Sequence, residues 1–177
     1  EDMAPDICMN FIPELKNVKI GDPIGRGGFG IVYRGIWNSS EVAIKEVLFK
    51  SAISSANSEA FRQFAHEVWM MSKLSHPNLV HLHGITLHPL RMIMEFCPGM
   101  DLCNFLHNNP RIPRDPQYAL FRLRIAIDVA KGMQHLHNLS PPVIHRDLRS
   151  PNVFVVSSDD NAETVAKIGD FGLSEFT

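Results

Sequence analysis

Residues 143–152 read V-I-H-R-D-L-R-S-P-N, and this stretch decides how the rest of the sequence is interpreted. After an apolar start, the next eight residues carry His145, Arg146, Asp147, Arg149 and Asn152. The helix-breaking Pro151 lies among them. Because charged groups are costly to bury, such a segment makes a poor core element. The stretch therefore predicts a reactive loop at the surface.

The composition predicts a globular chain of one domain, which 177 residues could build in two lobes. Apolar residues make up 45% and charged residues 20% of the chain, and the formal net charge is −2 without a basic stripe. These values argue against nucleic acid as a partner and against electrostatic docking to a membrane. The sequence has no apolar run long enough to span a bilayer, and no basic segment leads into an apolar one, so nothing in it suggests secretion. Three cysteines without C-x-x-C spacing predict a reducing, cytoplasmic location.

The N-terminal half has the pattern of a β-meander with one helix. Residues 1–17 show no clear period and are interpreted as a lead-in segment, and residues 51–58 are expected to form a loop. Phe61, Phe64, Val68 and Met71 recur at helical spacing, which predicts a helix that ends near Leu74. β-Branched runs between turn residues predict five strands, at 18–20, 31–34, 42–47, 79–86 and 90–96.

The pattern becomes helical after Pro98, so the lobe boundary is placed at 95/96. Residues 123–137 are predicted to form a helix whose apolar stripe comprises Leu123, Ala126, Ile127, Ala130, Met133 and His137. Arg122, Arg124, Asp128 and Lys131 lie elsewhere on the helical wheel. Residues 153–156 and 165–168 are predicted to form a short strand pair around a polar loop.

A glycine-rich segment, G-x-G-x-x-G-x-V, runs from Gly25 to Val32. Glycines let a backbone approach phosphate oxygens without a clash from Cβ. The motif alone is weak, because dinucleotide-binding folds carry the same letters and a ligand-free hairpin would also fit. Here β-like residues follow the glycines, whereas the dinucleotide version opens a helix.

Two further motifs each place one charged residue near or just after the end of a predicted strand. Lys45 ends V-A-I-K, and such a lysine needs an acidic partner. Glu67 on the predicted helix is preferred for this, and Glu59 at the helix start is the alternative, since a carboxylate there commonly complements the helix dipole. The third motif, D-F-G, begins with Asp170 directly behind a predicted strand.

Taken in order, G-x-G-x-x-G-x-V, V-A-I-K, H-R-D-L-R-S-P-N and D-F-G resemble a eukaryotic protein kinase domain over residues 18–177. The catalytic-loop sequence, R-M-I-M-E-F at 91–96 and the long polar insert before D-F-G resemble the tyrosine-kinase-like group, and most of all its Roco and mixed-lineage types. The resemblance implies an α+β, bilobal fold. Its N-lobe, residues 18–95, would hold a five-stranded antiparallel sheet and one helix, and residues 96–177 would form part of a mainly helical C-lobe.

The resemblance also implies ATP and Mg²⁺ as cofactors and a role for each motif residue. Asp147 would be the catalytic base, Asn152 and Asp170 would hold the metal, and Lys45, paired with Glu67, would bind the α- and β-phosphates. Arg149 stands where serine/threonine kinases usually carry Lys near the γ-phosphate. Nucleotide contacts are implied for Ile24, Gly25, Arg26, Gly27, Gly28, Phe29, Gly30, Val32, Ala43, Lys45, Met94, Glu95, Phe96, Cys97, Asp101, Phe154 and Asp170.

Met94 resembles the gatekeeper, residues 95–97 the hinge, and Val32, Ala43 and Phe154 the apolar walls around the adenine. Phe154 departs from the usual Leu. Met71, Leu82, His145 and Phe171 resemble the stacked residues between helix and catalytic loop, and each is also an ordinary core residue.

We therefore expect a protein kinase that phosphorylates Ser or Thr hydroxyls of a protein substrate, although Arg149 leaves a preference for Tyr open. A nucleotide-binding pseudokinase or scaffold is the alternative, and a dinucleotide-dependent oxidoreductase has little support because Lys45 stands near the place of its acidic residue. The chain ends soon after Gly172, before the activation loop and A-P-E segment that the family implies. We expect it to be a piece of a longer protein with flanking regulatory domains.

Overall fold

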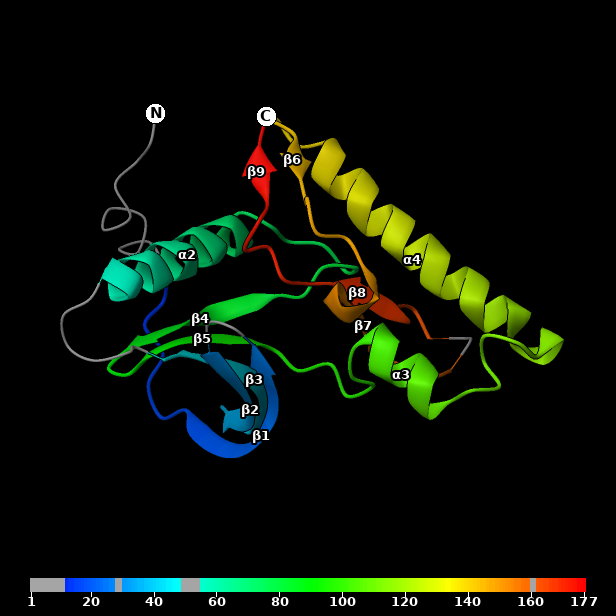
Figure 1. Cartoon of the computed structure of the whole chain (residues 1–177), viewed down its shortest axis with the longest axis horizontal. Coiled ribbons are helices and arrows are strands. Elements are labelled where there is room, and N and C mark those ends of the chain that lie inside the picture. The colour runs from blue at the N-terminus through cyan, green and yellow to red at the C-terminus, as the bar shows by residue number, and fades with distance from the viewer. Residues whose placement is uncertain (1–11, 28–29, 49–54, 160–161) are drawn as a thin grey trace. The chain divides into compact units, whose positions relative to one another are not determined.

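The computed structural model describes residues 12–27, 30–48, 55–159 and 162–177, and Figure 1 shows the chain. The chain forms two compact units. Unit 1 comprises Glu1–Lys73 and His81–Phe96, and unit 2 comprises Leu74–Val80 and Cys97–Thr177. From the sequence, residues 74–80 were expected in the N-terminal lobe. They belong to unit 2 because their backbone bonds there, for example from Val80 N–H to the Ile168 carbonyl at 2.8 Å.

Unit 1 contains the predicted five-stranded antiparallel sheet, in the spatial order β1-β2-β3-β5-β4 (Figure 1). Its strands are β1 (Lys19–Gly27), β2 (Gly30–Trp37), β3 (Ser40–Val47), β4 (Leu82–Leu87) and β5 (Leu90–Glu95). Tight turns at Asn38-Ser39 and His88-Pro89 join neighbouring strands, as the turn-forming residues predict. The fourth strand begins later than expected, since residues 79 and 80 belong to unit 2.

One helix, α2 (Ser55–Ser72), belongs to unit 1, and Figure 1 shows it beside β4. Phe64, Val68 and Met71 are buried, as their helical spacing predicted. The prediction of a loop over residues 51–58 is wrong at its C-terminal end, because the helix already begins at Ser55. Residues 49–54 lie outside the described part of the chain.

Pairing across the strands separates the two faces of the sheet. Val42, Ile44 and Ile93 are fully buried in one cluster, against which Leu15, Val18, Tyr33 and Trp37 pack. Because side chains alternate along a strand, Ala43 and Lys45 point to the opposite face. Directly paired residues share a face, and Val32 pairs with Lys45 while Met94 pairs with Ala43. The register therefore places Val32, Ala43, Lys45 and Met94 on one face.

The end of the lead-in segment is part of unit 1. Glu14 forms a parallel bridge with Ile85 of β4. The Leu15 N–H donates to the Ile85 carbonyl at 2.8 Å, and the Ile85 N–H donates to the Pro13 carbonyl at 3.0 Å. Ile12 is buried. Residues 12–15 thus form a short bridge to the outer edge of β4 at Ile85, a pairing that no periodicity in so short a segment could reveal.

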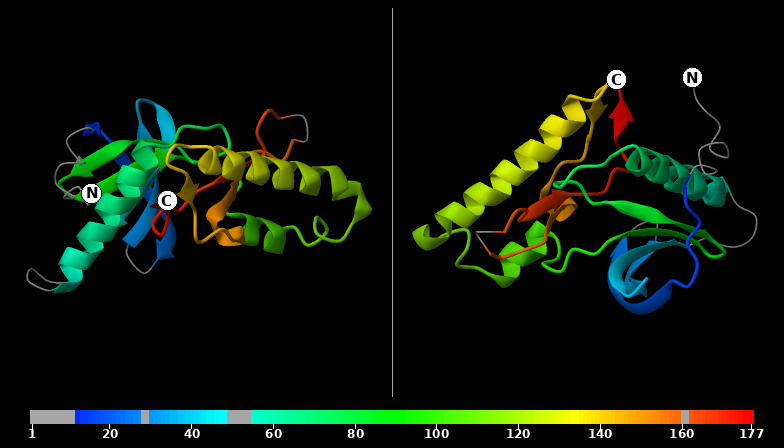
Figure 2. Two further views of the ribbon diagram at one scale, coloured as in Figure 1. Left: turned by 90° about the horizontal axis from the view of Figure 1, so that it is seen from above. Right: turned by 180° about the vertical axis from the view of Figure 1, so that it is seen from behind.

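Unit 2 is built around one long helix, α4 (Ala119–His137), which Figure 2 shows with the short pair β6 (Val143–Ile144) and β9 (Glu175–Phe176) near its C-terminal end. The predicted strand pair is confirmed as β7 (Val153–Val155) and β8 (Ala166–Ile168), which are antiparallel. Helix α3 (Leu102–Asn108) and two short 3₁₀ turns, η2 (Pro116–Tyr118) and η3 (Ser150–Asn152), complete the unit. Among the described residues, no helix has the length and apolar character that crossing a membrane requires.

Helix α4 has two apolar faces, and the predicted stripe is the exposed one. Its buried residues are Phe121, Ile125, Asp128, Gly132 and Leu136, which follow helical spacing on the other face. Leu123 is 54% exposed and Ile127 38% exposed, although both belong to the predicted stripe. Apolar residues occupy two faces of this helix, so periodicity could not choose between them. The choice follows from Gly132, where an added Cβ would lie 2.9 Å from Ile168 Cδ1 and 3.0 Å from the Asn78 carbonyl oxygen.

Candidate functional site

The side chain of Lys45 forms a bidentate ion pair with Glu67 in unit 1. Lys45 Nζ lies 2.8 Å from Glu67 Oε1 and 2.6 Å from Oε2. The Glu67 side chain is only 8% exposed and that of Lys45 25% exposed, so solvent screens the pair weakly. Of the two acidic candidates, the structure thus pairs Lys45 with Glu67. Glu59 instead accepts bonds from Arg62 and Gln63, which lower the pKa of its exposed carboxyl group.

The glycine-rich segment forms the β1–β2 hairpin, with Gly27 paired to Gly30 and Gly25 to Val32. Ile24 and Arg26 lie exposed on β1. A strand follows the glycines, so the helix that a dinucleotide fold would need is replaced by β2. At Gly30 the backbone passes so close to the Glu46 carbonyl that a Cβ would clash. Gly28 and Phe29 lie outside the described residues.

The predicted hinge crosses from unit 1 to unit 2. The Glu95 N–H donates to the His81 carbonyl at 2.9 Å, and the Arg34 guanidinium lies 5.0 Å from the centroid of the Phe96 ring. Cys97 is buried in unit 2 and its carbonyl accepts from Met100 N–H at 3.4 Å. Glu95 and Phe96 thus contact residues of unit 1, and Cys97 contacts a residue of unit 2.

In unit 2 the reactive loop predicted from the sequence is ordered by its own polar side chains. Asn152 Nδ2 donates to the backbone oxygen and to Oδ2 of Asp147, both at 2.8 Å. Arg149 Nε lies 3.3 Å from Asp147 Oδ1, and its side chain is 62% exposed. Asn152 is buried, whereas Asp147 is partly exposed. The loop therefore presents one carboxylate to solvent in a fixed orientation.

His145 connects this loop to the D-F-G segment. The Asp147 N–H donates to His145 Nδ1 at 3.3 Å, so the ring proton resides on Nε2, which donates to the Gly169 carbonyl at 3.1 Å. The His145 and Phe171 rings are 5.2 Å apart, and both side chains are buried. Burial lowers the pKa of His145, although the Gly169 bond and the carboxylates of Asp170 and Asp147 oppose this effect. The neutral imidazole is thus the form that fits the structure.

Asp170 lies next to the same loop. The Gly169 N–H donates to the backbone carbonyl of Asn152 at 2.9 Å, which places the residue before Asp170 against the residue that orients Asp147. Asp170 has a left-handed φ of 61°, and its side chain is exposed. This conformation strains the backbone of any residue other than glycine, and such strain often marks a functional position. The structure therefore brings Asp147, Asn152 and Asp170 together within unit 2.

Phe154 and Asp101 lie beside this group. Phe154 is partly buried on β7, and a Cβ at Gly169 would lie 2.9 Å from its ring. Asp101 forms an antiparallel bridge with Phe154. Its carboxylate caps α3, accepting from the backbone N–H of Asn104 at 2.9 Å and from the Asn104 side chain at 2.6 Å. The capping bonds account for an Asp at this position without any ligand.

The side-chain oxygens in unit 2 could supply some, but not all, of the ligands that a hard cation such as Mg²⁺ needs. The described residues contain no cluster of three or more His, Cys, Asp or Glu side chains at metal-binding distance. Asn152 uses its amide nitrogen on Asp147, which leaves the amide oxygen, and Asp170 adds a carboxylate. Mg²⁺ prefers such oxygens and commonly takes one or two protein ligands, with water and phosphate filling its other positions. Asn152 and Asp170 fit that pattern.

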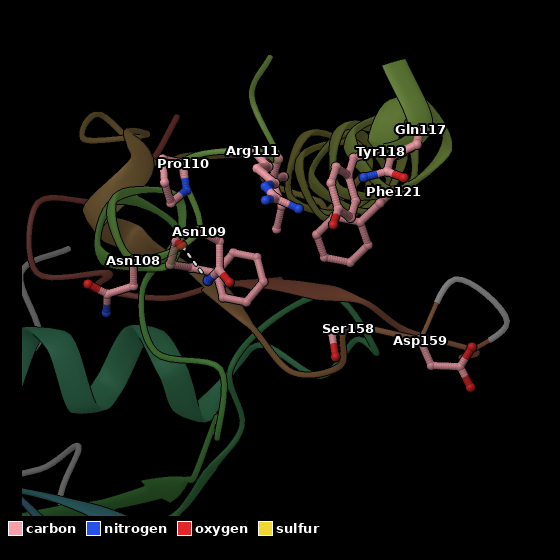
Figure 3. A pocket seen from close by; sticks show the side chains of 11 residues that line it. Asn108, Asn109, Pro110, Arg111, Gln117, Tyr118, Phe121, Ser158 and Asp159 are labelled. Atoms are coloured by element: carbon pink, nitrogen blue, oxygen red, sulfur yellow. Dashed lines mark hydrogen bonds between the residues drawn. The ribbon is translucent and has the colours of Figure 1, made fainter. Parts of the chain in front are cut away.

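A separate cavity of about 790 Å³ opens in unit 2 between α3, the start of α4 and Ser158-Asp159 (Figure 3). Phe105, Tyr118 and Phe121 form its apolar side, and Arg111 lies at its rim. Its lining includes no residue predicted for the site.

Residues 18–177 match the family model described as protein tyrosine and serine/threonine kinase. Three relatives from Dictyostelium discoideum align over nearly the whole chain: the probable serine/threonine-protein kinases pats1 (40% identical over 97% of the chain), roco11 (42% over 98%) and qkgA (38% over 98%). The aligned region is 6%, 12% and 13% of their lengths, so the chain spans a small part of each relative. The resemblance to a protein kinase domain and its α+β fold are thereby confirmed, and assignment to the tyrosine-kinase-like group stays a prediction.

Proposed function

Because the chain belongs to the protein tyrosine and serine/threonine kinase family, we propose that the protein of which it is part transfers the γ-phosphoryl group of ATP to Ser or Thr hydroxyls of a protein substrate. The observation that carries this proposal is the hydrogen-bonded group of Asp147, Asn152 and Gly169-Asp170 in unit 2. The preference for Ser and Thr rests on the names of the relatives.

Asp147 is the proposed catalytic base. Its Oδ2 accepts from Asn152 and its Oδ1 faces Arg149, so the carboxylate is held in one orientation while remaining partly exposed. In that position it orients the substrate hydroxyl for in-line attack and accepts its proton as the new P–O bond forms and the bond from the γ-phosphorus to the departing ADP breaks. Arg149 carries its charge on the solvent side of this carboxylate, where it can bind the anionic γ-phosphate.

Lys45 and Glu67 are the proposed phosphate-binding pair of unit 1. Glu67 uses both carboxylate oxygens to hold the ammonium, which fixes its position on the face that also carries Val32, Ala43 and Met94. This face combines one fixed positive charge with apolar side chains, the combination that a nucleotide with a triphosphate and a flat base requires.

Asn152 and Asp170 would hold Mg²⁺ through their side-chain oxygens. When bound, the metal neutralises charge on the phosphate oxygens during transfer. The chain supplies the orientation: Asn152 is buried and committed to Asp147, and Asp170 is set by the left-handed turn after Gly169.

We infer that this domain works in the cytoplasm as part of a longer protein with flanking regulatory domains. Cys103 is a free, exposed thiol in the described part of the chain, which suits a reducing compartment. The relatives are many times longer than the matched region. A pseudokinase is less well supported, since Lys45, Asp147 and Asp170 all retain the chemistry of turnover.

The proposal is tested by assaying phosphate transfer to a protein substrate with the complete protein and with its Lys45→Met and Asp147→Asn variants. Both substitutions should abolish transfer, because one removes the phosphate-binding cation and the other the proton acceptor. ATP binding should persist in Asp147→Asn. Transfer retained in both variants would overturn the assignment, and ATP binding without turnover in the unmodified protein would favour the pseudokinase.

A further inference from the structure

Strand β8 pairs with β7 on one edge, and on the other edge Ile168 forms a parallel bridge with Leu79. At the start of β8, the backbone N–H groups of Ala166 and of Val165, the residue before the strand, donate to a single oxygen, Asp128 Oδ2, at 3.1 and 2.7 Å. Asp128 belongs to α4 and is completely buried. A buried carboxylate is costly unless its charge is compensated, so these two donors account for its presence in the core.

The neighbouring turn of α4 binds the chain just before β8. Arg124 Nη2 donates to the Ala162 carbonyl at 2.7 Å and to the Glu163 carbonyl at 3.2 Å. Arg124 therefore binds the carbonyls of Ala162 and Glu163, and Asp128 binds the N–H groups of Val165 and Ala166 a little further along the chain. Within the described part of the chain, Arg124 Nε and Asp128 Oδ1 are buried without a hydrogen-bond partner. Apolar side chains packed at the same place would not carry this cost.

Asn78 completes the same edge. Its side chain donates to the Ala166 carbonyl at 3.1 Å, and its backbone carbonyl accepts from the Ile168 N–H at 2.8 Å. The position of β8 is thus held by backbone bonds to residues 78–80 and by the side chains of Asn78 and Asp128, of which Asp128 is the charged one. The next two residues of the chain are Gly169 and Asp170, and the Gly169 N–H bonds to the Asn152 carbonyl at 2.9 Å.

We propose that Asp128 is a positioning residue for Asp170. Its carboxylate fixes the register of β8 against α4, and β8 delivers Asp170 to the catalytic loop at the distance that metal binding needs. This inference rests on the proposed function, in which Asp170 holds Mg²⁺. Asp128 touches neither nucleotide nor metal in it, and acts only through the strand.

Two variants of the complete protein test the proposal. Asp128→Leu keeps the branching at Cγ in a somewhat larger side chain but leaves two N–H groups buried without an acceptor. Asp128→Asn keeps an acceptor oxygen and removes the charge. Glu163→Gln is the matched control, because it removes one negative charge from an exposed side chain beside the same segment. The two readouts are amide hydrogen exchange without ligand and the Mg²⁺ concentration that gives half-maximal phosphate transfer.

Asp128→Leu should raise that Mg²⁺ concentration by about 10–100-fold, as expected when an outer residue positions a metal ligand. Saturating Mg²⁺ should restore most of the rate. Asp128→Asn should show a smaller shift in the same direction, and Glu163→Gln none. In both Asp128 variants the amides of Val165 and Ala166 should exchange faster, while the amide of Glu95 in unit 1, which donates to the His81 carbonyl at 2.9 Å, should keep its protection.

Several results would overturn the inference. One is a loss of rate that raised Mg²⁺ does not restore, which would indicate a structural role alone. Another is an unchanged Mg²⁺ requirement in a folded Asp128→Leu variant. If that variant fails to fold, unchanged exchange at Val165 and Ala166 in Asp128→Asn would have the same consequence. Activity retained in Asp170→Asn would instead refute the proposed function itself, so the two failures can be distinguished.

Discussion

Lys45 on β3 and Glu67 on α2 meet as a bidentate pair, with Nζ 2.8 and 2.6 Å from the two carboxylate oxygens. The two residues stand 22 positions apart in the sequence, so the contact fixes how the helix lies on the sheet of unit 1. A charge-assisted pair with little solvent exposure contributes more than a surface ion pair.

This pair should show a measurable coupling free energy. Lys45→Met should lower the free energy of unfolding by about 1–3 kcal/mol, because the buried Glu67 carboxylate loses its cation. The double variant Lys45→Met/Glu67→Leu should lose less than the sum of the single variants. Urea unfolding of the four proteins closes the cycle, and a coupling below about 0.5 kcal/mol would show that the two side chains act independently.

Asn152→Ala should reduce the rate of phosphate transfer by a factor of about 10²–10⁴, because Asp147 loses the donor that orients it. Steady-state kinetics with a protein substrate provide the measurement. Asn109→Ala is the control, since Asn109 also donates its side-chain amide to a backbone carbonyl, that of Phe105 at 2.8 Å, but is exposed. Equal effects of the two substitutions would contradict a specific role for Asn152.

Stability should decrease as the pH falls through the ordinary histidine pKa, about 6.5. Burial lowers the pKa of His145 in the folded state, so the unfolded chain takes up a proton that the folded protein resists. The contribution is therefore present above about pH 6.5 and is lost on acidification. The pKa values of His76 and His83 are also lowered, chiefly by burial, and add the same sign.

Comparison with His145→Phe isolates the contribution of His145 to the pH dependence of the unfolding free energy. The variant should have a shallower dependence of unfolding free energy on pH between about 5.5 and 7.5, since only the titration of His145 has been removed. Urea unfolding at several pH values measures the slopes. Identical slopes in the two proteins would mean that other groups carry the whole effect.

Gly84→Ala should displace the segment 12–15 from β4. A Cβ at this position would lie 2.8 Å from Leu15 Cγ and would also clash with the Pro13 carbonyl oxygen. Hydrogen exchange should therefore accelerate at the Leu15 and Ile85 amides, which donate across this pairing. Gly25→Ala is the control, because an added Cβ there meets only Val32 Cβ, at 3.8 Å. Unchanged protection in Gly84→Ala would show that the pairing tolerates a side chain.

The site was easier to predict than the packing around it. Lys45, Asp147, Asn152 and Asp170 could be recognised because their chemistry demands fixed residue types at fixed positions relative to strands and loops. The pairing with Glu67 was also accessible, since only two acidic residues on the predicted helix were candidates. The proximity of Asp147, Asn152 and Asp170 required the structure, because it depends on backbone bonds of Gly169 and on the ring of His145.

The face of α4 could not be predicted from periodicity. Leu123 and Ile127 are as apolar as Phe121 and Ile125, and the buried face even contains a carboxylate. On the helical wheel Asp128 was placed only away from the predicted apolar stripe. It is buried because unpaired N–H groups at the start of β8 need an acceptor, and that requirement belongs to the tertiary structure.

The short bridge that residues 12–15 form to β4 also affects how the protein behaves at high concentration. β4 is the last strand of its sheet, and an uncovered last strand offers free backbone groups to other molecules. In this chain the Ile85 N–H and carbonyl are already occupied by Pro13 and Leu15. A recombinant domain trimmed to begin at Val18 would expose that edge, and edge-to-edge self-association would then compete with purification and crystallisation.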